Sequence, residues 1–336
     1  MAKGTQIGVF FDGTGNNMDK DLAAECETNV AKLFQLYDTT ETDDFTENAK
    51  FYIRGVGSKR GEYILGGMTG DGGEQRISTM LDNVRHHLNR PEVRDRSPKV
   101  FDVCGFSRGA AQARHFVNVL KHEGIIDQRS GEAFGDIQIR FLALFDSVAS
   151  FGLPGNAIDP GFDFSVDPDY VQHTLHLVAE HESRSTFDLL SIKTAADASL
   201  PANMQETVYP GAHSDIGGGY AYSPAQPRVT RRVPGKNRTH TIPGQPEKLN
   251  HLSRISLRVM HAAMQAAGVP LLPLEQHPHY AQRIAISPEL QKFFEQHRSG
   301  MPFSDAHASP YIHDSRYATD TFVDDWRDTP KPRTVY

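Results

Sequence analysis

Short apolar runs and segments of helical periodicity alternate along this chain, and this alternation limits the folds it can adopt. The runs typical of buried strands are residues 5–11, 49–57, 98–106, 137–148 and the shorter 204–211. The segments with apolar residues at helical spacing are residues 29–37, 74–88, 107–124, 170–183 and 252–268. Strands that alternate with helices favour an α/β protein, with a mainly parallel sheet covered by helices on both faces.

The size of the chain suits one elaborated domain. Its 336 residues, 38% of them hydrophobic, can bury a substantial core. We expect a single domain, 1–336, with loop insertions rich in Gly, Pro and charged residues at about 55–73, 151–169 and 221–247. The third insertion is locally basic, and we interpret it as solvated chain, with contact to anionic lipid or to a partner protein as the alternative.

The composition and the sequence pattern argue against a nucleic-acid-binding, a disulfide-rich, a Sec-exported or a membrane-spanning protein. The net charge of -7 gives no overall electrostatic footprint for nucleic acid. The two cysteines, Cys26 and Cys104, cannot form a disulfide framework. The N-terminus has no Sec-type signal, and no uncharged apolar stretch is long enough to span a membrane. We therefore expect a soluble protein that is cytoplasmic in the cell that makes it.

The pentapeptide Gly105-Phe106-Ser107-Arg108-Gly109 lies between a strand-like run and a helix-like segment. This is the context of a nucleophile elbow, in which a serine occupies a strained strand-to-helix turn. Glycines at both ends let the chain pass close to itself there. We interpret Ser107 as a catalytic nucleophile, and the alternative is a small residue in a tight turn.

A serine nucleophile needs an acid and a histidine later in the chain. Asp146 directly follows the apolar run RFLALF, so we expect it at the carboxyl edge of the sheet, where such folds bind ligands. A turn or helix-capping aspartate is the alternative interpretation. Asp163 and Asp167, in the following loop, are the substitutes.

Among sixteen histidines, His213 has the most informative setting. It follows a short strand and precedes three consecutive glycines, where backbone passes close to other atoms. We interpret it as the general base, with His313 and His181 as rivals. Asp215 could orient its neighbour, cap a turn or bind a cation.

The oxyanion of such a reaction needs two N–H donors. One is the N–H of Arg108, after the nucleophile, and the other is expected from Gly13 or Thr14 in the loop after the first strand. Asp12 could fix that loop by local hydrogen bonds. The same glycines do not have the Gly-x-Gly-x-x-Gly spacing of a dinucleotide site.

Six blocks carry a family resemblance: VFFDGTGNN, YIRGVG, GFSRGAAQAR, FLALFDSVASFG, YPGAHSDIGGGY and YIHDSR. In this order they resemble the uncharacterised α/β-hydrolase domain family that includes the first lipase class of type VI secretion effectors. The resemblance implies a phospholipase of A1 or A2 type that is delivered into the periplasm of rival bacteria to attack membrane phospholipids. It also implies a secretion-apparatus carrier and an immunity protein. By motif match, the nucleophile, acid and histidine fall on Ser107, Asp146 and His213.

The mechanism expected from these residues requires no metal and no organic cofactor. Binding residues cluster on loops, so the three insertions are candidates for the substrate mouth and a lid. Two other functions remain open. The first is hydrolysis of soluble esters, thioesters or peptides by the same residues. The second is a non-catalytic module of the same fold that binds lipid or a partner.

Overall fold

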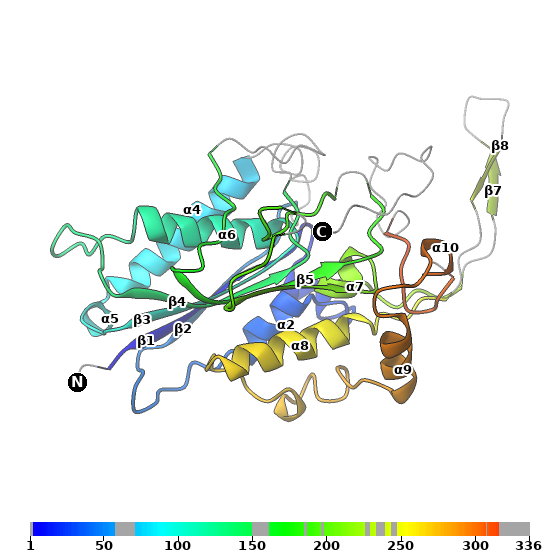
Figure 1. Ribbon diagram of the computed structural model, residues 1–336. Coiled ribbons are helices and arrows are strands. Elements are labelled where there is room, and N and C mark those ends of the chain that lie inside the picture. Colours follow the sequence, from blue (N-terminus) through cyan, green and yellow to red (C-terminus); the bar gives the residue numbers. More distant parts are fainter. Residues whose placement is uncertain are drawn as a thin grey trace.

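A six-stranded parallel sheet forms the centre of the molecule (Figure 1). The computed structural model describes residues 3–57, 71–149, 161–184, 187–195, 198–225, 229–232, 239–242, 247–306 and 308–315. The strands of the sheet are β1 (Thr5–Phe11), β2 (Ala49–Ile53), β3 (Lys99–Phe106), β4 (Ile137–Phe145), β5 (Val171–Ala179) and β6 (Met204–Tyr209). Every residue of β1 and β3 is buried, as expected for parallel strands covered on both faces.

The strand order is β2-β1-β3-β4-β5-β6, so the chain changes direction across the sheet between β1 and β3. From β1 it moves outward to β2, and it then returns to place β3 on the other side of β1. Open α/β sheets bind ligands beyond the carboxyl ends of the strands at such a switch point. Asp12 follows β1 and Ser107 follows β3, so both lie at this edge.

Helices cover both faces of the sheet (Figure 1). One face carries α4 (Asp71–Leu88) and α6 (Arg108–His122), and the other carries α2 (Asn29–Leu36) and α8 (Ser253–Ala266). The described residues also form the helices α1 (Met18–Asp21), α5 (Pro91–Arg94), α7 (His213–Gly217), η1 (Leu274–Gln276), α9 (Pro288–His297) and α10 (Phe303–Ala306). Among the described residues, no helix combines the length and apolar character that a membrane span requires.

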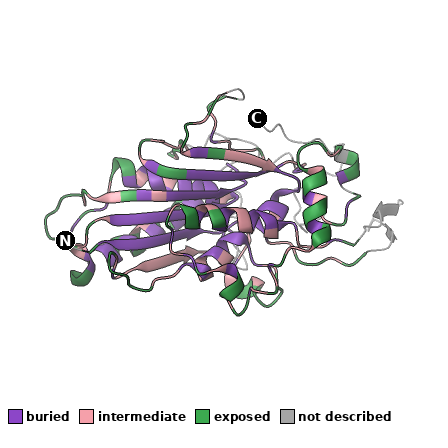
Figure 2. Cartoon of the chain, turned by 60° about the horizontal axis from the view of Figure 1, so that its bottom comes forward, coloured by how far each residue is buried: buried purple, intermediate pink, exposed green. Residues whose placement is uncertain are grey.

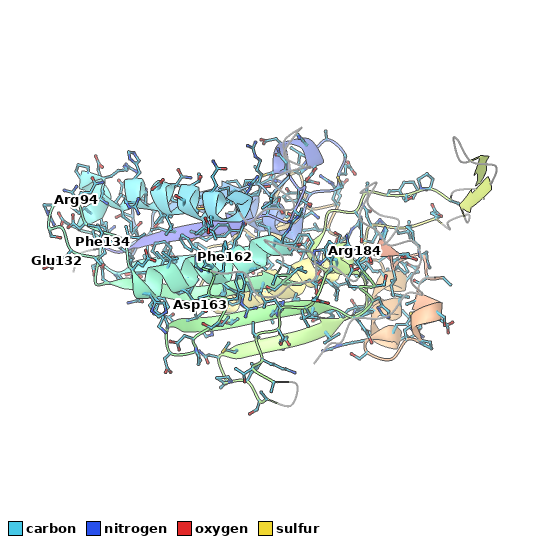
Figure 3. The ribbon with its side chains drawn as sticks, turned by 90° about the horizontal axis from the view of Figure 1, so that it is seen from above. Arg94, Glu132, Phe134, Phe162, Asp163 and Arg184 are labelled. Atoms are coloured by element: carbon cyan, nitrogen blue, oxygen red, sulfur yellow. The ribbon has the colours of Figure 1, made fainter. Side chains whose placement is uncertain are left out.

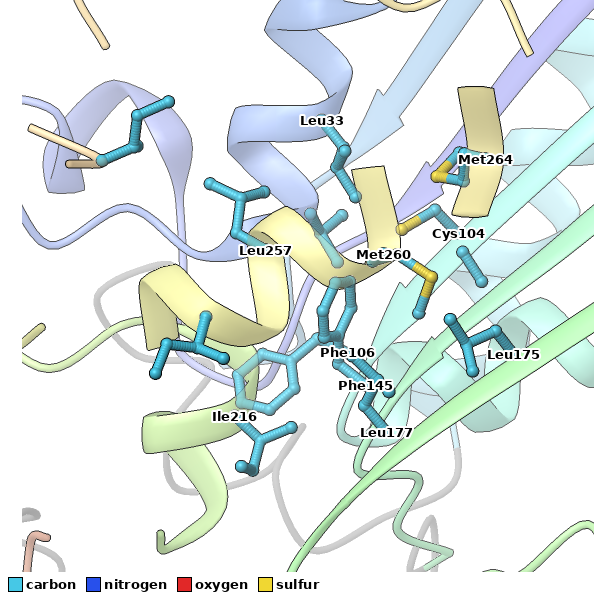
Figure 4. Packing of buried hydrophobic residues seen from close by; sticks show 14 of the residues in the cluster. Leu33, Cys104, Phe106, Phe145, Leu175, Leu177, Ile216, Leu257, Met260 and Met264 are labelled. Carbon is cyan, nitrogen blue, oxygen red and sulfur yellow. The ribbon is translucent and has the colours of Figure 1, made fainter. Parts of the chain in front are cut away.

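Two apolar cores lie on the two faces of the sheet. In β1, Phe10 packs with α2 and α8, while its neighbours Val9 and Phe11 pack with α4 and α6. The α8 side is shown in Figure 4, where Met260 and Met264 face the sheet near Cys104 and Leu175. Figure 2 shows buried strands inside and exposed residues on the outer helix surfaces. Successive side chains of one strand point to opposite faces of the sheet, so a single strand contributes residues to both cores.

The predicted fold class is confirmed, and most predicted elements are present. The prediction of a helix over 170–183 was wrong, because Val171–Ala179 is strand β5. This strand pairs with β4 on one side and β6 on the other, and its second half is buried throughout. Apolar residues on both faces obscure the two-residue alternation of a strand, and the remaining spacing imitates a helix.

The three predicted insertions are described only in part. Residues 58–70, 150–160, 226–228, 233–238 and 243–246 lie outside the described residues. Within the basic insertion, β7 (Val229–Arg232) and β8 (Thr239–Ile242) form an antiparallel hairpin that lies away from the central sheet (Figure 1). This hairpin was not expected from the sequence. The single-domain organisation and the lid stay predictions.

Candidate active site

Ser107 occupies a strained turn between β3 and α6. Its φ of 60° and ψ of -130° lie in a region that residues with a side chain rarely adopt. The turn is held on both sides, because the N–H of Ser107 donates to Phe145 O (3.0 Å) and its C=O accepts from Ala110 N (3.0 Å). A strained backbone that its surroundings hold in place is typical of a functional turn.

The two glycines of the pentapeptide are required by close backbone contacts. A Cβ atom at Gly105 would lie 2.4 Å from the C=O oxygen of Gly109. A Cβ atom at Gly109 would lie 2.4 Å from the C=O oxygen of Phe11. Any larger residue at either position would therefore push α6 away from the sheet.

Asp146 and His213 are joined by a short contact at the carboxyl edge of the sheet. Asp146 directly follows β4, and its Oδ2 lies 2.6 Å from His213 Nδ1. Its other oxygen, Oδ1, accepts the N–H of Ala179 (2.8 Å). Both side chains are buried, so this pair is shielded from water.

The imidazole of His213 lies between two phenyl rings. Phe106, the residue before Ser107, is 4.6 Å away between ring centroids, and Phe187 is 4.9 Å away. Burial lowers the pKa of His213, and the hydrogen bond to Asp146 opposes this shift. Its Nε2 atom is buried and makes no hydrogen bond with any described residue. When Nδ1 carries the imidazole proton and donates it in a hydrogen bond to Asp146, Nε2 has a lone pair that can accept a proton beside the elbow.

The loop after β1 is held by the carboxylate of Asp12. This group accepts hydrogen bonds from Gly13 N (2.7 Å), from the hydroxyl of Thr28 (2.7 Å) and from the hydroxyl of Tyr52. Burial raises the pKa of Asp12 to about 6. These contacts fix the backbone at the position where the second oxyanion donor is predicted.

The hydrogen bonds of this loop distinguish between Gly13 and Thr14 as the second oxyanion donor. The N–H of Gly13 is engaged by Asp12, whereas the N–H of Thr14 makes no hydrogen bond within the described part of the chain. The side chain of Arg108 donates from Nε to Thr14 Oγ1 (2.5 Å), which ties the loop to the first residue of α6. Thr14 is therefore the better candidate of the two.

The rival residues have other partners. His313 Nδ1 lies 2.6 Å from Asp215 Oδ1, and Asp215 Oδ2 accepts the N–H groups of His313 (2.9 Å) and Ala212 (3.0 Å). Asp215 therefore caps the start of α7 and holds His313. The second rival, His181, accepts the N–H of Gly211 at Nδ1 (3.0 Å).

The substitute acids lie away from His213. Asp163 accepts the hydroxyl of Ser165 (2.7 Å), and Asp167 pairs with Lys121 (2.6 Å). Figure 3 shows Asp163 beside α6, well separated from Arg184 at the carboxyl edge of the sheet. Asp146 is thus the acid that the structure brings to His213.

Sequence reasoning missed Glu182, a buried acid that follows β5. Its carboxylate accepts the N–H of His213 (3.3 Å) and the hydroxyl of Ser315 (2.6 Å), and it pairs with Arg184 (3.0 Å). Despite the desolvation that opposes it, the Arg184 guanidinium holds the pKa of Glu182 well below its usual range. Recognising β5 as a strand would have placed Glu182 at the same edge as Asp146.

A second missed pair supports the residue after Asp146. The N–H of Ser147 donates to His176 Nε2 (3.0 Å), so the proton of the neutral imidazole is on Nδ1, which faces Glu206 (2.8 Å). The pKa of Glu206 falls to about 2 because its hydrogen bonds with His176, with the N–H of Ile192 and with the hydroxyl of Ser191 outweigh its burial. Among the described residues, no cluster of three or more His, Cys, Asp or Glu side chains could hold a metal ion.

The chain matches a known protein family over most of its length. Residues 5–137 and 131–263 match the family described as T6SS, phospholipase effector Tle1-like, catalytic domain. The chain belongs to this family of type VI secretion phospholipase effectors. No curated protein matches the chain significantly.

Two solved structures share the fold of this family member. One is an uncharacterized protein from Pseudomonas aeruginosa, with a TM-score of 0.61 and 24% identity over 91% of this chain and 52% of that one. The other is a Tle1 effector bound to the VgrG spike of the type VI secretion system, with a TM-score of 0.64 and 21% identity. That match covers 93% of this chain and 85% of the effector. The chain thus spans about half the length of the Pseudomonas protein.

Proposed function

We propose that this protein is a serine hydrolase that cleaves the carboxylic esters of phospholipids, with Ser107, Asp146 and His213 as its catalytic residues. The observation that carries the proposal is the 2.6 Å contact between Asp146 and His213. It leaves the Nε2 atom of His213 as a buried base packed against the residue before Ser107. The A1 or A2 type of cleavage predicted from the sequence is part of the proposal.

The first half of the reaction forms an acyl-enzyme. His213 Nε2 accepts the proton of Ser107 Oγ as this oxygen attacks the ester carbonyl. Asp146 stabilises the imidazolium that forms, and the N–H groups of Arg108 and Thr14 bind the oxyanion. The imidazolium then gives its proton to the leaving alcohol oxygen, and the ester bond breaks.

The second half releases the fatty acid. Water attacks the acyl carbon while His213 accepts one of its protons, and the same two N–H groups bind the second oxyanion. Collapse of this intermediate breaks the bond to Ser107 Oγ, which regains its proton from His213. The cycle needs protein groups and water only.

The biological part of the proposal rests on the family. We infer delivery by type VI secretion into a target-cell periplasm, an immunity protein in the producer, and a spike protein as the carrier. The related effector bound to a VgrG spike supports the carrier. Size-exclusion chromatography of the chain mixed with a VgrG spike protein from the same bacterium tests this contact, and separate elution would contradict it.

The catalytic proposal is tested with a fluorophosphonate probe and with phospholipid vesicles. The wild type is compared with Ser107→Ala, His213→Ala and the control Ser304→Ala, which removes a hydroxyl from an exposed serine. We expect labelling and fatty-acid release in the wild type and the control, and neither in the other two. Vesicles whose two acyl chains differ assign the cleaved position. A folded wild type that neither labels nor releases fatty acid would favour a non-catalytic lipid-binding module.

A further inference from the structure

The structure contains a cavity of about 510 Å³ that is not lined by Ser107, Asp146 or His213. Its wall is formed by residues 23–27, by Gly219 and Tyr220 after α7, by the start of α8, and by Lys32 and Arg283. Tyr220 also stacks on His313, with 4.1 Å between ring centroids. The cavity therefore borders the contacts that hold α7, and its size suits a small organic ligand.

Three cationic side chains, Lys32, Arg254 and Arg283, gather at this wall. Burial lowers the pKa of Lys32 to about 8; the charge of Glu27 opposes this shift, and the charges of the two arginines act in the same direction as burial. The pKa of Arg254 is also lowered by burial and by Arg283, while the charge of Glu25 opposes the shift. The cations are thus close enough to repel one another in a partly desolvated space, an arrangement that an anion would stabilise.

Of these three cations in the described part of the chain, Arg283 is the one that forms salt bridges with the carboxylates of the cavity. Arg283 binds both oxygens of Glu27 (3.2 and 2.7 Å), and its Nε lies 3.7 Å from Glu25. Arg254 donates to the C=O of Ala285 (3.0 Å). In the described part of the chain, no carboxylate lies within salt-bridge distance of Lys32 or Arg254, and the Lys32 ammonium makes no hydrogen bond.

We propose that this cavity is a binding site for a phosphate-bearing anion, held by the ammonium of Lys32 and the guanidinium of Arg254. A phosphate group carries enough oxygens and charge to pair with both cations at once. The cavity is larger than one phosphate group, so the bound species carries a small organic group or is free phosphate with water. Either free phosphate or the headgroup phosphate of a lipid supplies this chemistry, and only the second source rests on the proposed function.

The site is tested by calorimetric titration with inorganic phosphate and with glycerol 3-phosphate. The variants are Lys32→Met, which keeps most of the side-chain volume, and Arg254→Gln. The control Lys292→Met removes a charge from the exposed side of α9. We expect binding by the wild type and the control, and an affinity lower by roughly tenfold or more in Lys32→Met and Arg254→Gln, because each loses a charged hydrogen bond. Circular dichroism and thermal melting verify that each variant is folded.

Vesicle sedimentation distinguishes the two sources. If the ligand is a lipid headgroup, vesicles of phosphatidylglycerol bind Ser107→Ala, and either inorganic phosphate or the additional Lys32→Met substitution releases them. If the ligand is free phosphate, neither inorganic phosphate nor Lys32→Met changes the amount of protein that sediments with the vesicles, while the titration still shows phosphate binding. The Ser107→Ala background separates this site from hydrolysis, so a failure of the proposed function leaves these measurements interpretable. Absence of phosphate binding in the wild type, or equal binding by Lys32→Met and Lys292→Met, would overturn the proposal.

Discussion

The hydroxyl of Ser315 donates a hydrogen bond of 2.6 Å to the carboxylate of Glu182, which lies 133 residues earlier in the chain. The same carboxylate accepts the N–H of His213. The end of the described chain is thus connected, through one acid, to the histidine that we propose as the general base. We therefore expect Ser315 and Glu182 to act as positioning residues for His213.

Replacement of Ser315 by alanine removes one hydrogen bond to Glu182 and leaves the proposed catalytic residues intact. We expect kcat to fall by roughly tenfold with KM nearly unchanged, because a hydrogen bond contributes about 1 kcal/mol and acts here on the geometry of His213. Ester-hydrolysis kinetics on a soluble substrate measure the effect. Ser315→Thr keeps the hydroxyl and should restore most of the rate. An equal loss in both variants would show that the hydroxyl is not what matters.

Replacement of Asp146 by asparagine should lower kcat by about four orders of magnitude with little change in thermal stability. The amide oxygen can still accept the N–H of Ala179, so the local fold is kept. The amide NH2 would then face His213 Nδ1, which forces the imidazole proton onto Nε2 and removes the base. Steady-state kinetics and a melting curve test both parts. Activity within tenfold of the wild type would exclude Asp146 as the orienting acid.

The pH dependence of kcat/KM should have its acid limb below pH 6.5, since burial lowers the pKa of His213 below that value. The base works when neutral, so the rate is lost as pH falls through the lowered pKa. Phe187→Ala exposes the imidazole to water and should move the limb to higher pH. Phe293→Ala, which removes a ring from α9, is the control and should leave the limb in place. A limb that stays fixed in Phe187→Ala would contradict this account.

Replacement of Gly109 by alanine should destabilise the protein by at least about 2 kcal/mol, because the new Cβ would overlap backbone atoms that cannot move independently. The matched control is Gly135→Ala, where no atom lies within 4 Å of the new Cβ. Urea unfolding followed by circular dichroism compares the two. Equal stabilities would mean that the elbow tolerates a side chain and is looser than its contacts indicate.

The sequence predicted the parts of this protein that depend on local pattern. The apolar runs of β1, β3 and β4, and the residues that directly follow them, place Asp12, Ser107 and Asp146 at one edge because parallel strands end together. The close approach of His213 to Asp146 is consistent with the predicted order of these residues, while their catalytic roles stay proposals.

What sequence reasoning missed depends on contacts between distant segments. Strand β5 is recognisable only with β4 and β6 beside it, since its apolar residues follow no clean alternation. Without β5, Glu182 has no visible link to the sheet edge. Its contact with Ser315 comes from tertiary packing, and no local spacing encodes it.

The contact between Ser315 and Glu182 cannot form until translation has reached residue 315. A ribosome releases the chain from its N-terminus, and segments made early begin to fold before later ones emerge. The sheet can assemble once β6 has left the exit tunnel, but the hydrogen bond from Ser315 to Glu182 forms only after residue 315 follows. A nascent chain that ends before residue 315 would contain Ser107, Asp146 and His213 but would lack the hydrogen bond from Ser315 to Glu182.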